Sequence, residues 1–154
     1  MRGDVAEWLG RGLQSLVQRF ESARRLLPRC AALIRRVTWV FRRIAVYLVV
    51  GVFDTADDAH VHFLASNELS LAYGAKFGFV VRGDSVDGLG DEAWRLWAHG
   101  NGRQVTYHWR RENLVTEVHV HCYGDCGPDV DSNVDAAARA WAEAIDEGAR
   151  SSHG

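Results

Sequence analysis

The chain has 154 residues, a length that allows one domain with an appended segment and no more. Its charge is divided unequally: residues 1–53 hold ten arginines against three acidic residues, a net charge of +7, whereas residues 54–154 have a net charge of −9. Cys30, Cys122 and Cys126 are an odd set without a disulfide framework, so a reduced, cytoplasmic setting is predicted.

Residues 3–26 carry an apolar pattern near helical spacing, which predicts an amphipathic helix. The residues of that pattern are Val5, Trp8, Leu9, Leu13, Leu16, Val17 and Phe20. The same segment can also be back-translated as the sense strand of a transfer-RNA gene. Residues 12–15 accept GGC CTG CAA AGC, an anticodon loop carrying GCA, and residues 19–22 accept CGG TTC GAG TCC, a T-loop with its closing pairs.

The two ends of this segment are self-complementary at the nucleotide level. Residues 3–5 permit GGCGACG and residues 24–26 permit its complement CGTCGCC, as the two strands of an acceptor stem require. Helical spacing often arises by chance, whereas paired acceptor strands, an anticodon and a T-loop in one register do not. Residues 3–26 therefore resemble the in-frame translation of a cysteine tRNA gene. This resemblance implies a mis-assigned start and either a mobile element, which often integrates at tRNA genes, or an ordinary neighbouring gene.

Residues 29–53 contain five arginines and no acidic residue. As protein, this composition predicts a basic helix that lies on a membrane surface. The arginines interrupt it too often for a transmembrane span, and no clear signal-peptide cleavage site precedes Asp54. We favour a translated spacer; the valines that offer a GTG start are Val49, Val50 and Val52. The predicted organisation is a non-native segment over residues 1–52, helical if expressed, and a small domain over residues 53–154.

Between residues 53 and 154 the hydrophobicity alternates in five segments, as it does in β-strands. These segments are 60–65, 76–82, 94–99, 105–110 and 117–123. Ser66 is expected to cap a short helix that stops at Gly74. Asn101 and its flanking glycines predict a hairpin between the third and fourth strands.

A last helix is expected over residues 133–149. Its apolar stripe consists of Val134, Ala138, Trp141 and Ile145. We therefore predict an α+β fold in which an antiparallel sheet of about five strands carries the C-terminal helix on one face and leaves the other face open. A doubtful helical segment precedes this domain.

The open face of the sheet is predicted to be basic and aromatic. Its members are His60, His62, Lys76, Arg82, Arg95, Trp97, His99, His108, Arg110, Glu117, His119, His121 and Tyr123. Such faces bind single-stranded nucleic acid by stacking bases on rings and pairing guanidinium groups with phosphates. The acidic remainder of the domain opposes a polyanion, so a protein partner, self-association or a merely solvated face is favoured. The residues assigned to binding are Arg95, Trp97, His99, His108, Arg110 and Tyr123.

Two His-x-His pairs offer a different use of the same face. His60 with His62, and His119 with His121, each place two imidazoles on one side of a predicted strand. If the two strands are neighbours, the four imidazoles are ligands for a divalent transition metal such as zinc, copper, nickel or iron.

Neither a glycine-rich phosphate loop nor a nucleophile elbow is found in the sequence. We therefore expect a small acidic binding or regulatory module and not an enzyme, with a metal-dependent enzyme or metal sensor as the alternative. Membrane contact is expected only if residues 29–53 are expressed. Lys76 is the only lysine, a bias that a GC-rich genome and a salt-adapted proteome would both produce. No known protein family is recognised in residues 53–154.

Overall fold

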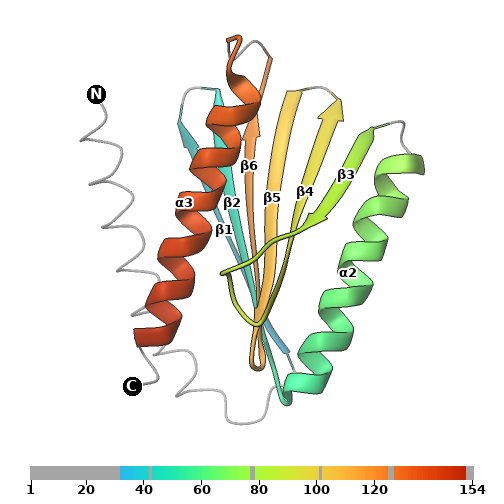
Figure 1. The fold of residues 1–154 in the computed structure, drawn as a ribbon, viewed down its shortest axis with the longest axis vertical. Coiled ribbons are helices and arrows are strands. Elements are labelled where there is room, and N and C mark those ends of the chain that lie inside the picture. Colours follow the sequence, from blue (N-terminus) through green and yellow to red (C-terminus); the bar gives the residue numbers. More distant parts are fainter. Residues whose placement is uncertain (1–31, 42, 77–78, 101, 125–126, 152–154) are drawn as a thin grey trace.

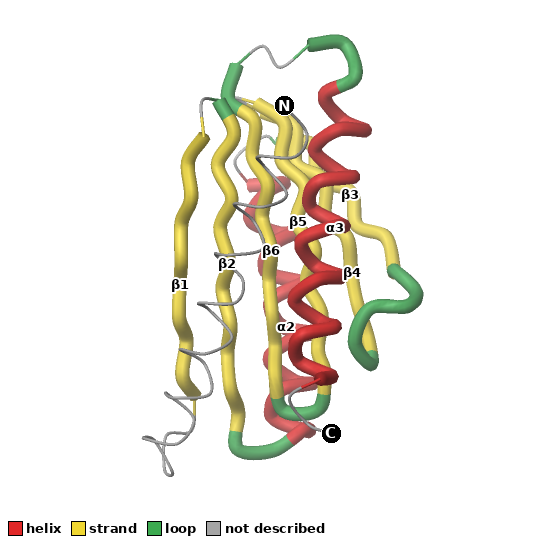
Figure 2. Tube along the Cα trace, turned by 90° about the vertical axis from the view of Figure 1, so that its left-hand side faces the viewer, coloured by secondary structure: helices red, strands yellow, loops and turns green. Residues whose placement is uncertain are grey.

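The computed structural model of the protein describes residues 32–41, 43–76, 79–100, 102–124 and 127–151. Its elements in chain order are β1 (Ala32–Phe41), β2 (Ile44–Phe53), α2 (Ala56–Lys76), β3 (Val80–Ser85), β4 (Glu92–Gly100), β5 (Gly102–Arg111), β6 (Leu114–Cys122) and α3 (Val130–Ser151). The six strands form one antiparallel sheet in the order β1-β2-β6-β5-β4-β3. Helices α2 and α3 lie on opposite faces of the sheet (Figures 1 and 2). The predicted α+β class, with the C-terminal helix on one face, is confirmed.

Helix α3 packs on β5 and β6 and forms the larger of the two hydrophobic cores. Its predicted stripe is buried at Val134, Ala138 and Trp141. On the strands beneath, Val105 and Val118 are fully buried, at 0% exposure. Because burial of apolar surface is the main favourable contribution to folding, this core is the chief source of stability in the domain.

Residues 60–65, whose alternating hydrophobicity predicts a strand, lie inside α2, so that prediction is wrong. Thr55 caps the start of the helix. The Thr55 hydroxyl accepts a hydrogen bond from the Asp58 backbone N–H at 3.0 Å and donates one to the Asp58 carboxylate at 2.7 Å. The helix then continues without a break through Ser66, the residue predicted to cap it.

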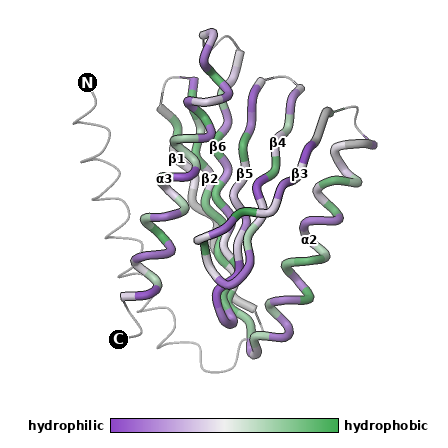
Figure 3. The backbone as a smooth tube through the Cα atoms, in the orientation of Figure 1, coloured by the Kyte–Doolittle hydropathy of each residue, from purple (hydrophilic) through white to green (hydrophobic). Residues whose placement is uncertain are grey.

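Helix α2 is hard to recognise because apolar residues occur on both of its sides. Ala59 and Phe63 face the sheet at 0% and 1% exposure, whereas Val61 and Leu69 are 66% and 68% exposed. The inner side also includes the polar residue Asn67, which is 3% exposed. Hydrophobic and hydrophilic stretches therefore alternate along the helix (Figure 3). Without one apolar stripe, the helical period is masked in the sequence.

Residues 44–53 form β2, which lies inside the sheet between β1 and β6. The helical expectation for this part of the chain is wrong, because β-branched and aromatic residues favour a strand. Ala45, Leu48 and Val50 are buried, at 0%, 2% and 6% exposure. The folded domain therefore includes residues on the N-terminal side of the predicted boundary at residue 53.

The segment that resembles a tRNA gene, residues 3–26, lies outside the described residues, so its origin stays a prediction. The same holds for the start at Val49, Val50 or Val52, although such a start would remove the first residues of β2. Within the part of the chain that the structure describes, no helix has the length and apolar character needed to cross a membrane.

The prediction places Trp94 under the C-terminal helix, but strand β4 is turned the opposite way. Arg95 pairs with Tyr107, and Trp97 pairs with Val105. Directly opposite residues share a face, and both partners on β5 belong to the core under α3. Trp94 instead packs against the smaller core under α2. The predicted open face is thus divided between the two sides of the sheet, and α2 covers part of the side expected to be open.

Asp146 on α3 is 1% exposed and joins three parts of the chain. Its carboxylate accepts two hydrogen bonds from Arg111 at 2.7 Å each, two from Arg150 at 3.2 and 2.8 Å, and one from the Gly90 N–H at 3.3 Å. Burial alone would raise the pKa of Asp146, but the hydrogen bonds from Arg111 and Arg150 lower it below its ordinary value. Gly90 has a φ of 59°, and a Cβ there would collide with the Arg110 carbonyl oxygen.

Asp146→Ala should lower the free energy of unfolding by about 3–5 kcal/mol, because Arg111 loses its buried partner. Glu143→Ala is the matched control, since it removes the exposed partner of Arg139 on the same helix and should cost less than about 1 kcal/mol. Urea unfolding of both variants measures the difference. Equal losses in the two variants would contradict the role of Asp146 as the anchor of α3.

Candidate functional site

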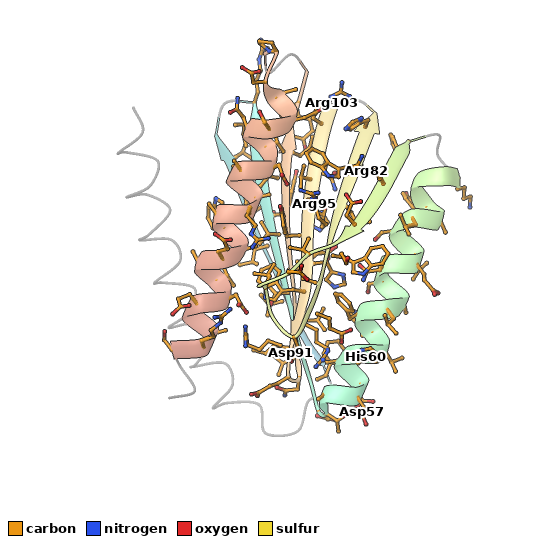
Figure 4. The ribbon with its side chains drawn as sticks, in the orientation of Figure 1. Asp57, His60, Arg82, Asp91, Arg95 and Arg103 are labelled. Atoms are coloured by element: carbon orange, nitrogen blue, oxygen red, sulfur yellow. The ribbon has the colours of Figure 1, made fainter. Side chains whose placement is uncertain are left out.

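A group of arginine and aromatic side chains lies on the α3 side of the sheet, beside α3 and not beneath it. We call it the arginine–tryptophan surface and define it by Arg82 on β3, Arg95, Trp97 and His99 on β4, and Arg103 on β5. The strand register places these residues on one face, because Arg82 is opposite Trp97. In the same way, His99 is opposite Arg103. Figure 4 shows Arg103, Arg95 and Arg82 on the strands to the right of α3, with Arg82 the farthest of the three from that helix.

Each arginine of this surface forms an ion pair. The N···O distances are 3.3 Å for Arg82 to Asp84, 3.3 Å for Arg95 to Asp84, 3.1 Å for Arg95 to Asp135 and 3.2 Å for Arg103 to Asp131. The Arg82 and Arg103 side chains are 71% and 42% exposed, so water screens their pairs and each contributes little to stability. Because the aspartates balance the arginines, the surface has no net charge.

Trp97 lies at the centre of the surface. The guanidinium carbon of Arg95 is 5.5 Å from the centroid of the Trp97 ring, a cation–π contact. On the other side, the His99 ring meets Trp97 edge-on, with 6.3 Å between centroids. These two contacts hold the three side chains in one row along β4.

Three buried nitrogen atoms of this surface, Arg95 Nε, Trp97 Nε1 and His99 Nε2, have no hydrogen-bond partner. Asp131 Oδ1 lies 4.0 Å from His99 Nε2, too far for a hydrogen bond, and forms the ion pair with Arg103. Among the other described residues only one buried side-chain nitrogen, Asn67 Nδ2, has no hydrogen-bond partner. A buried donor or acceptor without a partner costs about 1–3 kcal/mol, so folded proteins keep such atoms rare. Their concentration at one place marks the surface as a candidate binding site.

Arg95, Trp97 and His99, three of the residues predicted to bind, lie together in the structure. Two arginines that complete the surface are absent from the predicted binding residues. The sequence predicts Arg82 on the open face without a role, and it predicts no part for Arg103. The predicted hairpin contained the missing signal, because it sets Arg103 opposite His99.

The other three residues assigned to binding, His108, Arg110 and Tyr123, lie on the α2 side of the sheet. Arg110 is engaged with Glu92 on β4. The hydroxyl groups of Tyr123 and Tyr47 are hydrogen-bonded at 2.8 Å. The six residues therefore do not form one face, and that part of the prediction is wrong.

His108 is 2% exposed beneath α2. Its Nδ1 is 2.8 Å from Asn67 Oδ1, which accepts a hydrogen bond from the imidazole N–H, and its ring centroid lies 4.7 Å from that of Phe63. Burial lowers the pKa of His108 to about 4, against an opposing effect of Glu117. The imidazole is therefore neutral near pH 7 and joins α2 to the sheet.

A hydroxyl, an imidazole and a carboxylate are linked on the same side of the sheet. His119 Nδ1 is 2.8 Å from the Thr106 hydroxyl, and its Nε2 is 3.1 Å from Glu117. Burial alone would raise the pKa of Glu117, but the hydrogen bond with His119 and the neighbouring imidazoles lower it to about 2. This order of groups resembles that of a nucleophile, a base and an orienting acid. Thr106 is only 3% exposed, however, so its hydroxyl is not open to a substrate.

The four histidines predicted to bind a metal do not converge. His60 Nδ1 is 2.5 Å from Glu92, whereas the His62 ring lies against Phe53, with 4.8 Å between centroids. The rings of His121 and Tyr123 are stacked, with centroids 4.0 Å apart. No group of three or more histidine, cysteine or acidic side chains among the described residues is arranged to hold a metal ion. The predicted convergence fails because His60 and His62 lie on a helix and not on a strand.

Cys122 is fully buried and disulfide-bonded. The two other cysteines of the chain, Cys30 and Cys126, both lie outside the described residues. The expectation of a chain without disulfides is therefore wrong for Cys122.

No protein-family model and no curated protein sequence matches the chain. Among solved structures, the protein is similar to the extracellular domain of PknH from Mycobacterium tuberculosis, with 14% sequence identity and a TM-score of 0.40. The match covers 77% of this chain and 63% of that chain. A likeness of this size carries no argument about function.

The stability of the domain should depend on His108 between pH 6.5 and pH 4. Its pKa is about 4 in the folded state and 6.5 ordinarily, so its neutral form stabilises the fold fully above pH 6.5. As the pH falls to 4, the unfolded chain binds the proton first and about 3 kcal/mol of stability is lost. In urea unfolding at several pH values, His108→Gln should show a shallower dependence than wild type in this window. An unchanged dependence would contradict the burial of a neutral imidazole.

Proposed function

We propose that this protein is a small acidic binding module, not an enzyme, whose arginine–tryptophan surface engages a protein partner. The observation that carries the proposal is the concentration of buried, unpartnered polar atoms at this surface. Places where a fold leaves such groups unsatisfied are often functional. Arginine and tryptophan are also among the residues most enriched in interface hot spots, which supports a protein partner.

A protein partner fits this surface better than single-stranded nucleic acid does. The arginines are balanced by aspartates, and the whole chain has a net charge of −2, so no long-range field attracts a polyanion. A second copy of the chain is the simplest protein partner, and an unrelated protein is the other.

Trp97→Phe and Arg103→Glu should weaken partner binding about tenfold each, because both residues lie in the proposed surface. Two matched controls should leave binding unchanged: Trp94→Phe, on the opposite face of β4, and Arg139→Glu, on α3 beside Glu143. Partners are identified by crosslinking the full chain in extracts of its own cells, and sedimentation then gives the affinity of each variant. Self-association is measured in the same way. A partner that binds all four variants like wild type would refute the proposed surface.

The disulfide at Cys122 supports an oxidising compartment and not the cytoplasmic setting that the composition favours. We also retain the proposal that residues 3–26 derive from a cysteine tRNA gene, with a mobile element as one source. The pairing of Ile44 with Cys122 on β6 favours initiation upstream of β2 over a start at residues 49–52.

Intact mass of the natively expressed protein, with and without alkylation in denaturant, which exposes the buried Cys122, checks both points. We expect a mass shorter than the full 154 residues by at least the tRNA-like segment, and a Cys122 thiol that alkylates only after reduction. Detection of the full-length chain would refute the tRNA-gene origin. A Cys122 that alkylates before reduction would restore the cytoplasmic interpretation.

A further inference from the structure

The geometry points to an extended polypeptide segment as the element that the arginine–tryptophan surface binds, with its backbone carbonyl groups accepting hydrogen bonds from Arg95, Trp97 and His99. This inference rests on the proposed function and specifies the form of the partner. The segment lies along β4, on the face that α3 leaves uncovered.

The three donors are spaced like the carbonyl groups of an extended peptide. Arg95, Trp97 and His99 occupy alternate positions of β4, and a strand rises about 3.3 Å per residue, so their side chains follow one another at about 7 Å. An extended peptide presents the carbonyl oxygens of its own alternate residues along one side at the same interval. A chain laid along β4 therefore meets the three side chains in register.

The surface has hydrogen-bond donors that lack acceptors. Arg95 Nε and Trp97 Nε1 are N–H donors without an acceptor, and His99 Nε2 joins them when it holds the imidazole proton. Asp131 Oδ1, the acid oxygen of the Arg103 ion pair, is 4.0 Å from His99 Nε2, which is too far for a hydrogen bond. A polypeptide backbone presents carbonyl acceptors at regular intervals, so one extended segment can satisfy all three donors.

The charge balance of the surface favours an uncharged ligand. Three arginines and three aspartates leave the surface neutral, as the ion pairs of Arg82, Arg95 and Arg103 show. An uncharged backbone meets no electrostatic repulsion at such a surface, whereas a polyanion gains no net electrostatic attraction. The unpartnered donors are shielded by neighbouring side chains, so binding requires side chains at this surface to shift. The exposed Arg103–Asp131 pair is weak because it is screened by water.

Helix α3 leaves a strip of the sheet along β4 uncovered. The helix packs on β5 and β6, and no described helix lies over the front of β3 and β4 (Figure 1). Asp131 and Asp135 form the edge of α3 that borders this part of the sheet, through their ion pairs with Arg103 and Arg95. The uncovered strip thus follows the direction of β4, as an extended ligand requires.

The test uses the full chain and an array of uncharged synthetic peptides, about ten residues long to match the length of β4. We expect a subset of peptides to bind wild type and to bind Trp97→Phe about fivefold more weakly, because phenylalanine keeps the ring but lacks the N–H donor. Trp94→Phe, with the same change on the opposite face of the strand, should bind these peptides like wild type. Replacement of alternate peptide bonds in a bound peptide by trans-alkene isosteres, which keep the extended shape but lack the carbonyl oxygen, should abolish binding to the same surface.

Absence of any peptide that distinguishes Trp97→Phe from Trp94→Phe would overturn the inference. So would binding that tolerates loss of the alternate carbonyl oxygens, or tighter binding of a single-stranded oligonucleotide or an oligosaccharide at the same surface. If the peptides fail while the captured partner still depends on Trp97, the proposed function stands and the partner presents a folded surface. If both assays lose their dependence on Trp97, the proposed function fails as well.

Discussion

The register of β4 against β5 is the constraint on which the arginine–tryptophan surface depends. Side chains of a strand alternate between faces, so a slip of one residue would place Trp94 beside α3 and move Arg95 and Trp97 under α2. Two features oppose such a slip. Trp94 fills the apolar core under α2, and Gly102 at the start of β5 has a φ of 134° and no room for a Cβ, because that atom would collide with the Cys122 carbonyl oxygen. The surface is therefore a product of packing on both faces of the sheet.

The parts of the fold that the sequence predicts well are those with one face clearly different from the other. Strands β5 and β6 and helix α3 each have a regular apolar stripe, so alternation or helical period located them. The sequence does not predict helix α2 correctly, because Val61 and Leu69 are apolar yet exposed. Strand β2 is not predicted for another reason: the basic residues around it favour a spacer or a membrane-surface helix.

The candidate site was predicted in part. Arg95, Trp97 and His99 remained a group because residues at alternate positions of one strand share a face whatever its orientation. The prediction that they share a face with His108 and Arg110 is wrong. Tryptophan occurs on both faces of β4, so the sequence of the strand does not reveal which face meets α3. The prediction pairs His60 with His62 as in a strand, but on a helix residues two apart point about 160° away from each other, toward different neighbours.

The two helices are attached to the sheet in unequal ways, and this gives the domain a hierarchy of local stability. Helix α3 contributes several buried residues to the main core, whereas α2 adds Ala59 and Phe63 to a small one and relies on a polar contact between Asn67 and His108. Partial opening of a native protein begins where buried apolar contact is least. The fold can thus release α2 as a separate cooperative unit, while the sheet, α3 and the exposed strip along β4 keep their native arrangement.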